Sequence, residues 1–321
     1  MKAVLVRHLS PDLSGVELAE IERPQADILI RVRAASLNYP DLLMTQGKYQ
    51  FKPDVPFVSG LEMAGEVVEA PEGSGFKPGD KVRGGAKTGA FAEYAALPAA
   101  SLRTIPAGLD FASAAAMGAA YQTAYVALVE IGGLQAGQTV LVHGASGGVG
   151  LAACDLARAM GAQVIAATHS ADKLEQLHTI AKPHAAICNT GRFREDVAEI
   201  TDGRLCDLVF DPIGGDVFDE STRCVTFGGK LLVIGFVSGR IPDIAVNIPL
   251  IKGFSVVGVR AGEYARRFPD CGARIADAID RLAQEGRIVP HIHRRLPLTS
   301  WREAFETMQR GEIIGKLVLE P

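Results

Sequence analysis

Residues 139–150 read TVLVHGASGGVG, in which a short apolar run leads into a turn with glycines at positions 144, 147, 148 and 150. A helix-forming stretch follows, from about Val149 to Met160. A strand, a glycine turn and a helix in this order can hold a dinucleotide pyrophosphate, because the phosphates approach backbone N–H groups at the helix N-terminus and Cβ atoms would block them. The spacing is G-x-x-G-x-x-G, not the commoner G-x-G-x-x-G, and a turn of purely structural use remains the alternative.

Strand-like and helix-like segments alternate around this turn. Apolar strands are predicted at 163–168, 207–211 and 230–234, with helical segments between them. Strands that alternate with helices of about a dozen residues form a parallel sheet covered on both faces and joined by right-handed crossovers. Residues 121–260 are therefore predicted to form an α/β domain with a doubly wound parallel sheet of the Rossmann type.

The sequence on either side of this block has a different pattern. Residues 1–120 contain short strand patterns separated by Gly and Pro, such as the period-two alternation at 28–35. The tail contains two predicted helices, at 274–284 and 300–310, and a last strand at 315–319. Because the tail is too short to fold alone, residues 261–321 are expected to complete a mostly β domain with residues 1–120.

Length and composition bound the class of protein. A chain of 321 residues is expected to form two domains. It has 33 Lys and Arg against 37 Asp and Glu, and this net charge of −4 argues against a general nucleic-acid binder, which needs a positive field. Five cysteines without C-x-x-C spacing fit reduced thiols and a cytoplasmic location. No stretch approaches the ~20 apolar residues of a membrane span, so no membrane partner is expected.

The strand after the glycine turn bears on the choice between NAD and NADP. An NAD site favours an acidic residue at the C-terminal end of that strand. Here residues 167–173 read ATHSADK, in which Ser170 can donate to a 2′-phosphate and Lys173 can neutralise it. The acid of this stretch, Asp172, falls in the first turn of the next helix, where such a residue usually points to solvent. The sequence therefore predicts NADPH, and the alternative is that Ser170 caps a helix and Lys173 is a solvated charge.

Four further stretches resemble one family when they are taken together with residues 142–150. They are ASLNYPD at 35–41, PFVSGLEMAG at 56–65, KPGDKV at 77–82 and GKLVL at 315–319. Over essentially the whole chain the sequence resembles the medium-chain dehydrogenase/reductase superfamily, and within it the zinc-independent, zeta-crystallin-like quinone oxidoreductases. The resemblance implies a GroES-like catalytic domain beside the Rossmann domain, an NADPH-dependent reductase of quinones, and a homodimer or homotetramer.

The same resemblance bears on metal binding. In the zinc alcohol dehydrogenases of the superfamily, the catalytic metal uses a Cys where Asn38 stands and a His where Leu61 stands. Neither Asn nor Leu supplies the thiolate or imidazole that zinc prefers, and Glu62 alone is a single carboxylate. Residues 1–153 contain no cysteine for a four-cysteine structural site. We therefore expect no metal in this protein.

The resemblance also assigns cofactor contacts to particular residues. Asn38 and Thr123 are expected near the nicotinamide, and Lys316 is expected to complete the cofactor cleft from the C-terminal tail. The pyrophosphate is expected on the glycine turn, at Gly144, Ser146, Gly147, Gly148 and Val149. The nicotinamide ribose is expected beside Gly235, Phe236, Val237, Arg260, Ala261 and Gly262. Thr190 stands where many relatives carry a Tyr or His that stacks near the adenosine, so this contact is expected to be weaker here. Without the resemblance, Asn38 would be interpreted as a turn former and Phe236 as a core residue.

Hydride transfer is mainly a problem of positioning, so a metal or strong acid is not required. Asn38 is expected to orient the substrate or the nicotinamide amide. Tyr39 and Tyr49 lie in a loop expected to face the nicotinamide, and either could donate a hydrogen bond to the developing oxyanion. Tyr49 is preferred because a loop that contains Gly47 suits the rim of a cleft, although a surface or packing role is at least equally open for both tyrosines.

Two other functions stay open from the sequence. The same hydride geometry would reduce an activated C=C bond in an enone or an enoyl thioester, and Arg266 and Arg267 could then meet the phosphates of coenzyme A. The lack of an unambiguous catalytic side chain also leaves room for a non-catalytic NADPH-binding protein, either crystallin-like or RNA-binding. The acidic net charge disfavours RNA.

Overall fold

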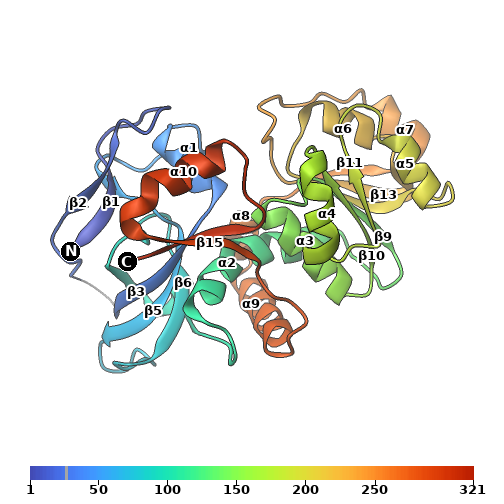
Figure 1. Cartoon of the computed structure of the whole chain (residues 1–321). Coiled ribbons are helices and arrows are strands. Elements are labelled where there is room, and N and C mark those ends of the chain that lie inside the picture. The colour runs from blue at the N-terminus through green and yellow to red at the C-terminus, as the bar shows by residue number, and fades with distance from the viewer. Residues whose placement is uncertain (26–27) are drawn as a thin grey trace. The chain divides into compact units, whose positions relative to one another are not determined.

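A computed structural model of the chain describes residues 1–25 and 28–321 and divides them into two compact units (Figure 1). The first unit contains residues 1–119 and 290–321, and the second contains residues 120–289. The predicted boundary at 260/261 is therefore wrong, because residues 261–289 belong to the second unit. The reason is packing: helix α9 (Pro269–Gln284) buries Ile275 and Leu282, and its Arg274 pairs with Glu130 at 2.8 Å, also in the second unit.

The second unit is built on a six-stranded sheet with the order β11-β10-β9-β12-β13-β14. Every pairing in this sheet is parallel, which confirms the predicted doubly wound sheet. The strands are β9 (Thr139–Val142), β10 (Gln163–Thr168), β11 (Ala185–Cys188), β12 (Cys206–Asp211), β13 (Val225–Val233) and β14 (Ser255–Gly258). β9 is buried along its whole length, as expected for a central strand with both faces covered.

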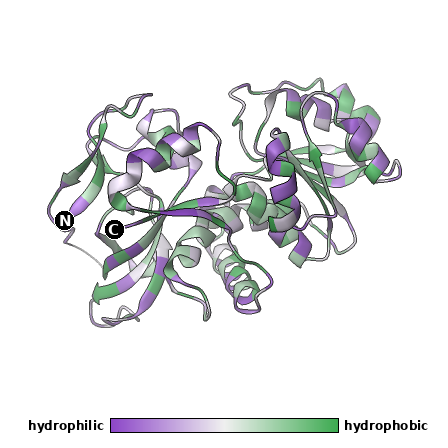
Figure 2. Ribbon diagram, in the orientation of Figure 1, coloured by the Kyte–Doolittle hydropathy of each residue, from purple (hydrophilic) through white to green (hydrophobic). Residues whose placement is uncertain are grey.

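Helices flank this sheet and connect its strands. They are α2 (Phe111–Tyr125), which begins in the first unit, the π-helix η2 (Val126–Ile131), α3 (Gly148–Ala159), the 3₁₀ turn η3 (Ala171–Lys173), α4 (Leu174–Ile180), α5 (Arg194–Ile200), α6 (Gly215–Ser221), α7 (Asn247–Lys252), α8 (Ala261–Arg267) and α9. In Figure 2 the central strands are mainly coloured hydrophobic, while α4 and α5 carry hydrophilic segments. The α/β alternation thus buries apolar strands beneath amphipathic helices.

The first unit is mostly β and contains two sheets. Its strands are β1 (Lys2–Val6), β2 (Val16–Glu20), β3 (Ile28–Leu37), β4 (Phe57–Val58), β5 (Glu62–Glu69), β6 (Lys81–Gly85), β7 (Tyr94–Leu97), β8 (Leu102–Thr104), β15 (Ile292–Pro297) and β16 (Lys316–Glu320). A three-stranded sheet has the order β2-β1-β4, and a seven-stranded sheet has the order β15-β16-β3-β5-β6-β8 with β7 paired to β3. Its helical segments are α1 (Tyr39–Thr45), η1 (Ala99–Ser101), η4 (Leu298–Ser300) and α10 (Trp301–Gln309).

The C-terminal tail completes the larger sheet of the first unit. β16 pairs antiparallel with β3, and β15 pairs parallel with β16. Trp301 and Phe305 of α10 are buried in the core of this unit. The prediction that the tail closes the N-terminal β domain is confirmed for residues 290–321. Within the described ranges, no helix combines the length and the apolar character needed to cross a membrane.

Candidate active site

Strand pairing in the first unit brings three distant polar residues to one place. β3 lies between β5 and β16, with Ser36 opposite Glu62 and Leu37 opposite Leu317. Asn38 follows β3 directly, and Lys316 begins β16. The sheet register therefore places Asn38, Glu62 and Lys316 side by side, although Lys316 is 254 residues from Glu62 in the sequence.

The three side chains form a buried hydrogen-bonded group. The Lys316 ammonium donates to Asn38 Oδ1 at 2.6 Å and to Glu62 Oε1 at 3.1 Å. Asn38 Nδ2 donates to the same Glu62 oxygen at 2.9 Å. The exposed fractions are 5% for Lys316, 5% for Glu62 and 9% for Asn38. A buried ion pair needs such additional hydrogen bonds, because its attraction must offset the loss of water from both charges.

The second oxygen of Glu62 is held by the backbone of α2. The Ala119 N–H donates to Glu62 Oε2 at 2.8 Å. A Cβ at Gly118 would lie 2.7 Å from this oxygen, so a larger residue there would displace the carboxylate. Both oxygens of Glu62 therefore have fixed partners, and the carboxylate presents one edge to Lys316 and Asn38.

Asp41 extends this group beneath Asn38. It stands in the first turn of α1, and its Oδ2 accepts the Asn38 N–H at 2.8 Å. Burial raises the pKa of Asp41 from 3.8 to about 7, against the opposing effects of the Asn38 N–H and the Lys316 charge. Its Oδ1 is buried with no hydrogen-bond partner among the described residues. We call Asn38, Asp41, Glu62 and Lys316 the ionic cluster; within it, the Asp41 carboxyl group is half protonated at about pH 7.

The ionic cluster is not suited to hold zinc. Asn38 and Glu62 both direct oxygens at the Lys316 ammonium, so a cation already occupies the place where their lone pairs converge. Leu61 is half-buried and packs against the apolar core of the first unit. In the described part of the chain, no three His, Cys, Asp or Glu side chains gather in a way that could hold a metal ion. The donors lack thiolate and imidazole, and a divalent ion would be repelled by the lysine.

The two tyrosines of the predicted loop have different surroundings. Tyr39 is the first residue of α1 and is 38% exposed. Tyr49 is half-buried and packs against the apolar core of the first unit. For Tyr49 the geometry favours the packing role that the sequence left open.

The glycine turn of the second unit needs its glycines for reasons of space. A Cβ on Gly150 would lie 2.1 Å from the carbonyl oxygen of Gly144, and one on Gly147 would lie 3.3 Å from it. Gly144 has φ +59°, in the left-handed region. Gly147 is the N-cap of α3, whose first N–H groups lack helical acceptors, as at every helix N-terminus. The turn therefore presents backbone N–H groups without helical acceptors, next to a space that a Cβ would occupy. This arrangement is suited to bind a pyrophosphate.

The turn lies at the C-terminal edge of the sheet, next to the point where the strand order reverses. Its Ala145 N–H donates to the carbonyl of Ala167 in β10 at 3.0 Å. On the other side, a Cβ on Gly144 would meet Ile213, which follows β12, at 3.1 Å. β9 is flanked by β10 and β12, so the turn stands at the switch point of a doubly wound sheet, where ligands of this architecture bind.

Ser170 and Lys173 follow β10 at the same edge. Ser170 is the N-cap of η3, yet within the described chain its side chain makes no capping hydrogen bond, so it does not act as the cap that the sequence left open. Lys173 ends η3 and is half-buried, and Asp172 is exposed. The hydroxyl and the ammonium thus follow the strand next to the glycine turn, as the NADPH prediction requires.

The remaining predicted contacts lie in several elements of the second unit. Thr123 is half-buried in α2, and Thr190 is exposed after β11, with its hydroxyl 3.3 Å from the Cys188 sulfur. Gly235, Phe236 and Val237 follow β13, and the last two are 41% and 48% exposed. Arg260 is the exposed N-cap of α8, which continues with buried Ala261 and exposed Gly262. Of the predicted residues of the first unit, Asn38 and Lys316 contact each other directly.

A second polar group, which the sequence reasoning missed, lies behind the glycine turn. His143 has no exposed surface; its Nε2 is 2.8 Å from Ser221 Oγ and its Nδ1 is 3.0 Å from Asn189 Nδ2. The Ser221 hydroxyl donates its proton to the Val217 carbonyl at 2.6 Å, so Nε2 must be the donor and Nδ1 the acceptor. Burial lowers the pKa of His143 from 6.5 to about 3, and the ring is neutral. We call His143, Asn189 and Ser221 the histidine cluster.

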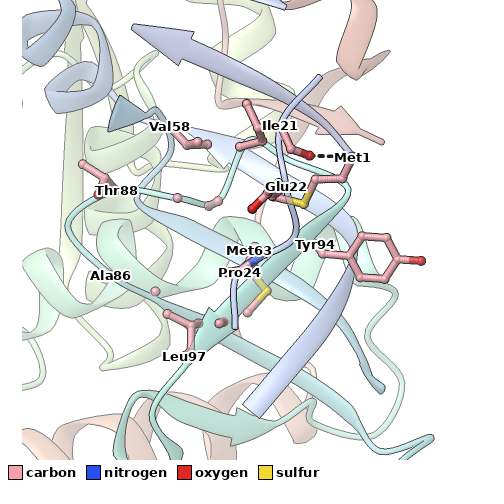
Figure 3. Close-up of a pocket in the computed structure, with 15 residues that line it drawn as sticks. Met1, Ile21, Glu22, Pro24, Val58, Met63, Ala86, Thr88, Tyr94 and Leu97 are labelled. Atoms are coloured by element: carbon pink, nitrogen blue, oxygen red, sulfur yellow. Dashed lines mark hydrogen bonds between the residues drawn. The ribbon is translucent and has the colours of Figure 1, made fainter. Parts of the chain in front are cut away.

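A separate cavity of about 200 Å³ lies in the first unit (Figure 3). Met63 of β5 lines it, together with Ile21, Val58 and Leu97. Met63 follows Glu62 in the strand, and successive side chains point to opposite faces. The cavity is therefore on the other face of β5 from the ionic cluster and plays no part in that site.

Comparison with known proteins places the chain in a family. Residues 24–107 match the model of the alcohol dehydrogenase GroES-like domain, and residues 148–283 match that of the zinc-binding dehydrogenases. A quinone oxidoreductase-like protein 2 homolog of Nematostella vectensis is 35% identical over 298 residues, which cover 92% of this chain and 81% of that protein.

Solved structures agree with the sequence matches. A probable oxidoreductase from Mycobacterium abscessus is 37% identical, with a TM-score of 0.91 and coverage of 100% of this chain and 99% of that one. A mycobacterial protein solved in complex with NADPH is 25% identical, with a TM-score of 0.91 and full coverage of both chains. The fold thus defines an oxidoreductase with a Rossmann-like and a GroES-like domain. The chain belongs to the quinone oxidoreductase-like proteins of the medium-chain dehydrogenase/reductase superfamily.

Proposed function

We propose that this oxidoreductase is an NADPH-dependent, zinc-independent reductase that transfers hydride to a quinone. The observation that carries the proposal is the glycine turn at the switch point of the parallel sheet, with Ser170 and Lys173 after the neighbouring strand. The relative solved with NADPH supports the cofactor, and the relative from Nematostella vectensis supports the quinone.

The chain's own residues divide the work of holding the cofactor. The amides of Gly148 and Val149 would bind the pyrophosphate, where the positive end of α3 favours negative charge. Gly147 would line the same site, while its own N–H donates to the Gly144 carbonyl at 2.8 Å. Ser170 would donate to the 2′-phosphate, and Lys173 would balance its charge. When bound, the reduced nicotinamide supplies a hydride, which is two electrons and one proton.

The nicotinamide end would be contacted by residues that the family likeness assigns. They are Asn38, Thr123, Gly235, Phe236, Val237, Arg260, Ala261, Gly262 and Lys316, with Gly144 and Ser146 completing the turn and Thr190 near the adenosine. The exposed apolar faces of Phe236 and Val237 support this assignment, because a nicotinamide ribose would cover them. The Asn38 Nδ2 donates to Ser36 and Glu62, and its Oδ1 accepts from Lys316. The second lone pair of Oδ1 is left to accept from the amide N–H of a ligand and so to orient it.

Reversing the charge at Lys173 tests the choice of cofactor. We expect Lys173→Glu to raise the KM for NADPH about 10-fold or more and to leave the KM for NADH within about twofold, because only NADPH carries the 2′-phosphate. The matched control is Lys252→Glu in α7, away from the C-terminal edge, which should change neither constant. Equal effects of Lys173→Glu on both cofactors would contradict the assignment of the 2′-phosphate.

An acceptor screen tests the reaction class. NADPH oxidation is measured with 1,4-benzoquinones, with enones and with an enoyl thioester, and we expect the highest kcat/KM with a quinone. A preference for enones or enoyl thioesters would replace the quinone by an activated C=C bond. Tight NADPH binding without turnover of any acceptor would instead support a non-catalytic, crystallin-like protein.

We also propose that the chain forms a homodimer or homotetramer. β14 is the edge strand of the parallel sheet, and near it lie the apolar side chains of Phe227, Val246, Leu250 and Ile251, which are at least 75% exposed. An exposed patch of this kind is typical of an interface. Light scattering should give twice or four times the monomer mass of 34.0 kDa, and Leu250→Asp should lower it. A monomeric wild-type protein would contradict the proposal.

We also propose a cytoplasmic location. The five unpaired cysteines are in keeping with a reducing compartment.

A further inference from the structure

Reduction of a quinone or an enone places negative charge on an oxygen atom, and the enzyme must stabilise and protonate it. The two tyrosines suggested by the sequence are poorly suited: Tyr49 packs against the apolar core, and Tyr39 is 38% exposed at the start of α1. A solvent-exposed donor gains little strength, because water competes for it. A buried cation would serve better.

Lys316 is such a cation. Its side chain is pinned from one side by Asn38 Oδ1 and Glu62 Oε1, at 2.6 and 3.1 Å. An ammonium has three N–H donors, and among the described residues these two acceptors account for two of them. One N–H therefore remains for an oxygen that the chain itself does not supply. With 5% exposure, the group is largely shielded from water, so its charge acts strongly on a nearby oxygen.

The rest of the ionic cluster holds the Lys316 side chain in place. Glu62 balances its charge and is itself held by the Ala119 N–H at 2.8 Å. Asn38 is oriented by Ser36 and Glu62, at 3.1 and 2.9 Å, so its oxygen faces the ammonium. The cluster thus holds a cation against Asn38, the position at which the zinc alcohol dehydrogenases of the superfamily carry a metal-binding Cys.

We propose that Lys316 is the catalytic acid of the reductase: its Nζ hydrogen-bonds to the acceptor oxygen, stabilises the oxyanion and then protonates it. This inference rests on the proposed function. It changes the role that the family likeness suggests for Lys316, from a cofactor contact to a group that reacts with the acceptor.

The step balances. The acceptor gains a hydride and becomes an oxyanion, a hydroquinone monoanion from a quinone or an enolate from an enone. One N–H bond of Lys316 breaks and one O–H bond forms, which leaves a neutral amine beside Glu62. The amine recovers its proton from water. In the net reaction, the acceptor, NADPH and one proton are converted to the reduced acceptor and NADP⁺. Where the product is an enol, it then tautomerises to the ketone.

Chemical rescue tests the role of Lys316. In Lys316→Ala we expect kcat to fall about 100-fold, as is typical when one oxyanion donor is lost, while the Kd for NADPH stays within about threefold. Added methylammonium, ethylammonium and 2-fluoroethylammonium should restore activity at least 10-fold, and the rescued rate should depend on the acidity of the amine. A purely structural lysine would not show this dependence. The control is Lys230→Ala, which removes a lysine bound to the Ile131 and Gly132 carbonyls in the second unit and should show neither effect.

Lys316→Ala leaves the Glu62 carboxylate buried without its partner charge, and this variant could therefore fail to fold. A second variant avoids the problem. Lys316→Ala/Glu62→Gln removes both charges, and the fluorescence of Trp301, the one tryptophan of the chain, reports whether the first unit is folded. A folded variant of either kind that keeps kcat within threefold of wild type, or whose rescue is independent of amine acidity, overturns the inference. If wild-type protein binds NADPH yet reduces no acceptor, the proposed function fails, and the inference falls with it before any variant is made.

Discussion

The ionic cluster of the first unit and the histidine cluster of the second are both buried groups of polar side chains drawn from distant parts of the chain, but they differ in charge. The ionic cluster contains an ammonium and a carboxylate, and Asp41 beside them has a pKa of about 7. The histidine cluster is neutral, with each ring nitrogen matched to one partner. We attribute the difference to their tasks, because a proposed acid must carry charge and a cofactor turn needs only rigid support.

The two clusters should consequently respond to pH in opposite directions. A buried acid with a raised pKa favours the folded state while it is protonated, so its contribution to stability is lost as the pH rises. A buried base with a lowered pKa favours the folded state while it is neutral, so its contribution is lost as the pH falls. Two predictions test this contrast in pH response, and a third tests the uncharged glycine turn beside the histidine cluster; they follow in order of decreasing expected effect.

The largest effect is expected from acid on the histidine cluster. His143 has an unfolded pKa of 6.5 and a folded pKa of about 3, so each pH unit below 6.5 should cost about 1.4 kcal/mol of folding free energy until the pH approaches 3. In His143→Gln this slope should be absent, because glutamine does not titrate. Urea unfolding of both proteins at pH 7 and pH 4.5, followed by far-UV circular dichroism, measures the difference. Equal losses in both would show that folding does not lower the pKa of His143.

The opposite slope is expected from Asp41 in the ionic cluster. Its pKa rises from 3.8 unfolded to about 7 folded, so each pH unit above 3.8 should cost about 1.4 kcal/mol until the pH passes about 7. The charges that face it are Lys316 and Glu62. Asp41→Asn keeps the shape and removes the titration, so it should be more stable than wild type at pH 8 and should gain less at pH 5. Trp301 fluorescence during urea unfolding follows this unit, and a gain that is independent of pH would contradict the assignment.

The smallest of the three effects tests whether the second unit acts through shape alone. Gly150→Ala adds one uncharged methyl group, whose carbon would lie 2.1 Å from the Gly144 carbonyl oxygen. We expect at least a 100-fold rise in the Kd for NADPH, about 2.7 kcal/mol, because the turn must open to accept it. Gly258→Ala in β14 is the control, since no described atom beyond its two chain neighbours lies within 4 Å of the new Cβ. Unchanged binding by Gly150→Ala would mean that the turn does not cradle the cofactor.

Local sequence patterns predicted the Rossmann-type sheet well. The strand predicted at 163–168 is β10, and the helix predicted from Val149 is α3 to within one residue at either end. Both elements are specified by a few neighbouring residues. A buried parallel strand needs a continuous apolar run, and the helix starts at a turn whose glycines have no Cβ to block a close approach of the backbone. The boundary after residue 260 was missed, because an amphipathic helix such as α9 shows which face is buried but not which neighbour buries it.

The sequence alone therefore predicted the dinucleotide-binding turn and the parallel strands beside it, and it showed that the usual zinc ligands are missing. Each of these features depends on residue types within a few positions of one another. Neither cluster could be recognised in this way. Lys316 meets Asn38 across 278 residues, and His143 meets Ser221 across 78, because sheet register and packing bring them together. The pKa values of Asp41 and His143 likewise follow from burial, which exists only after folding has removed water from around them.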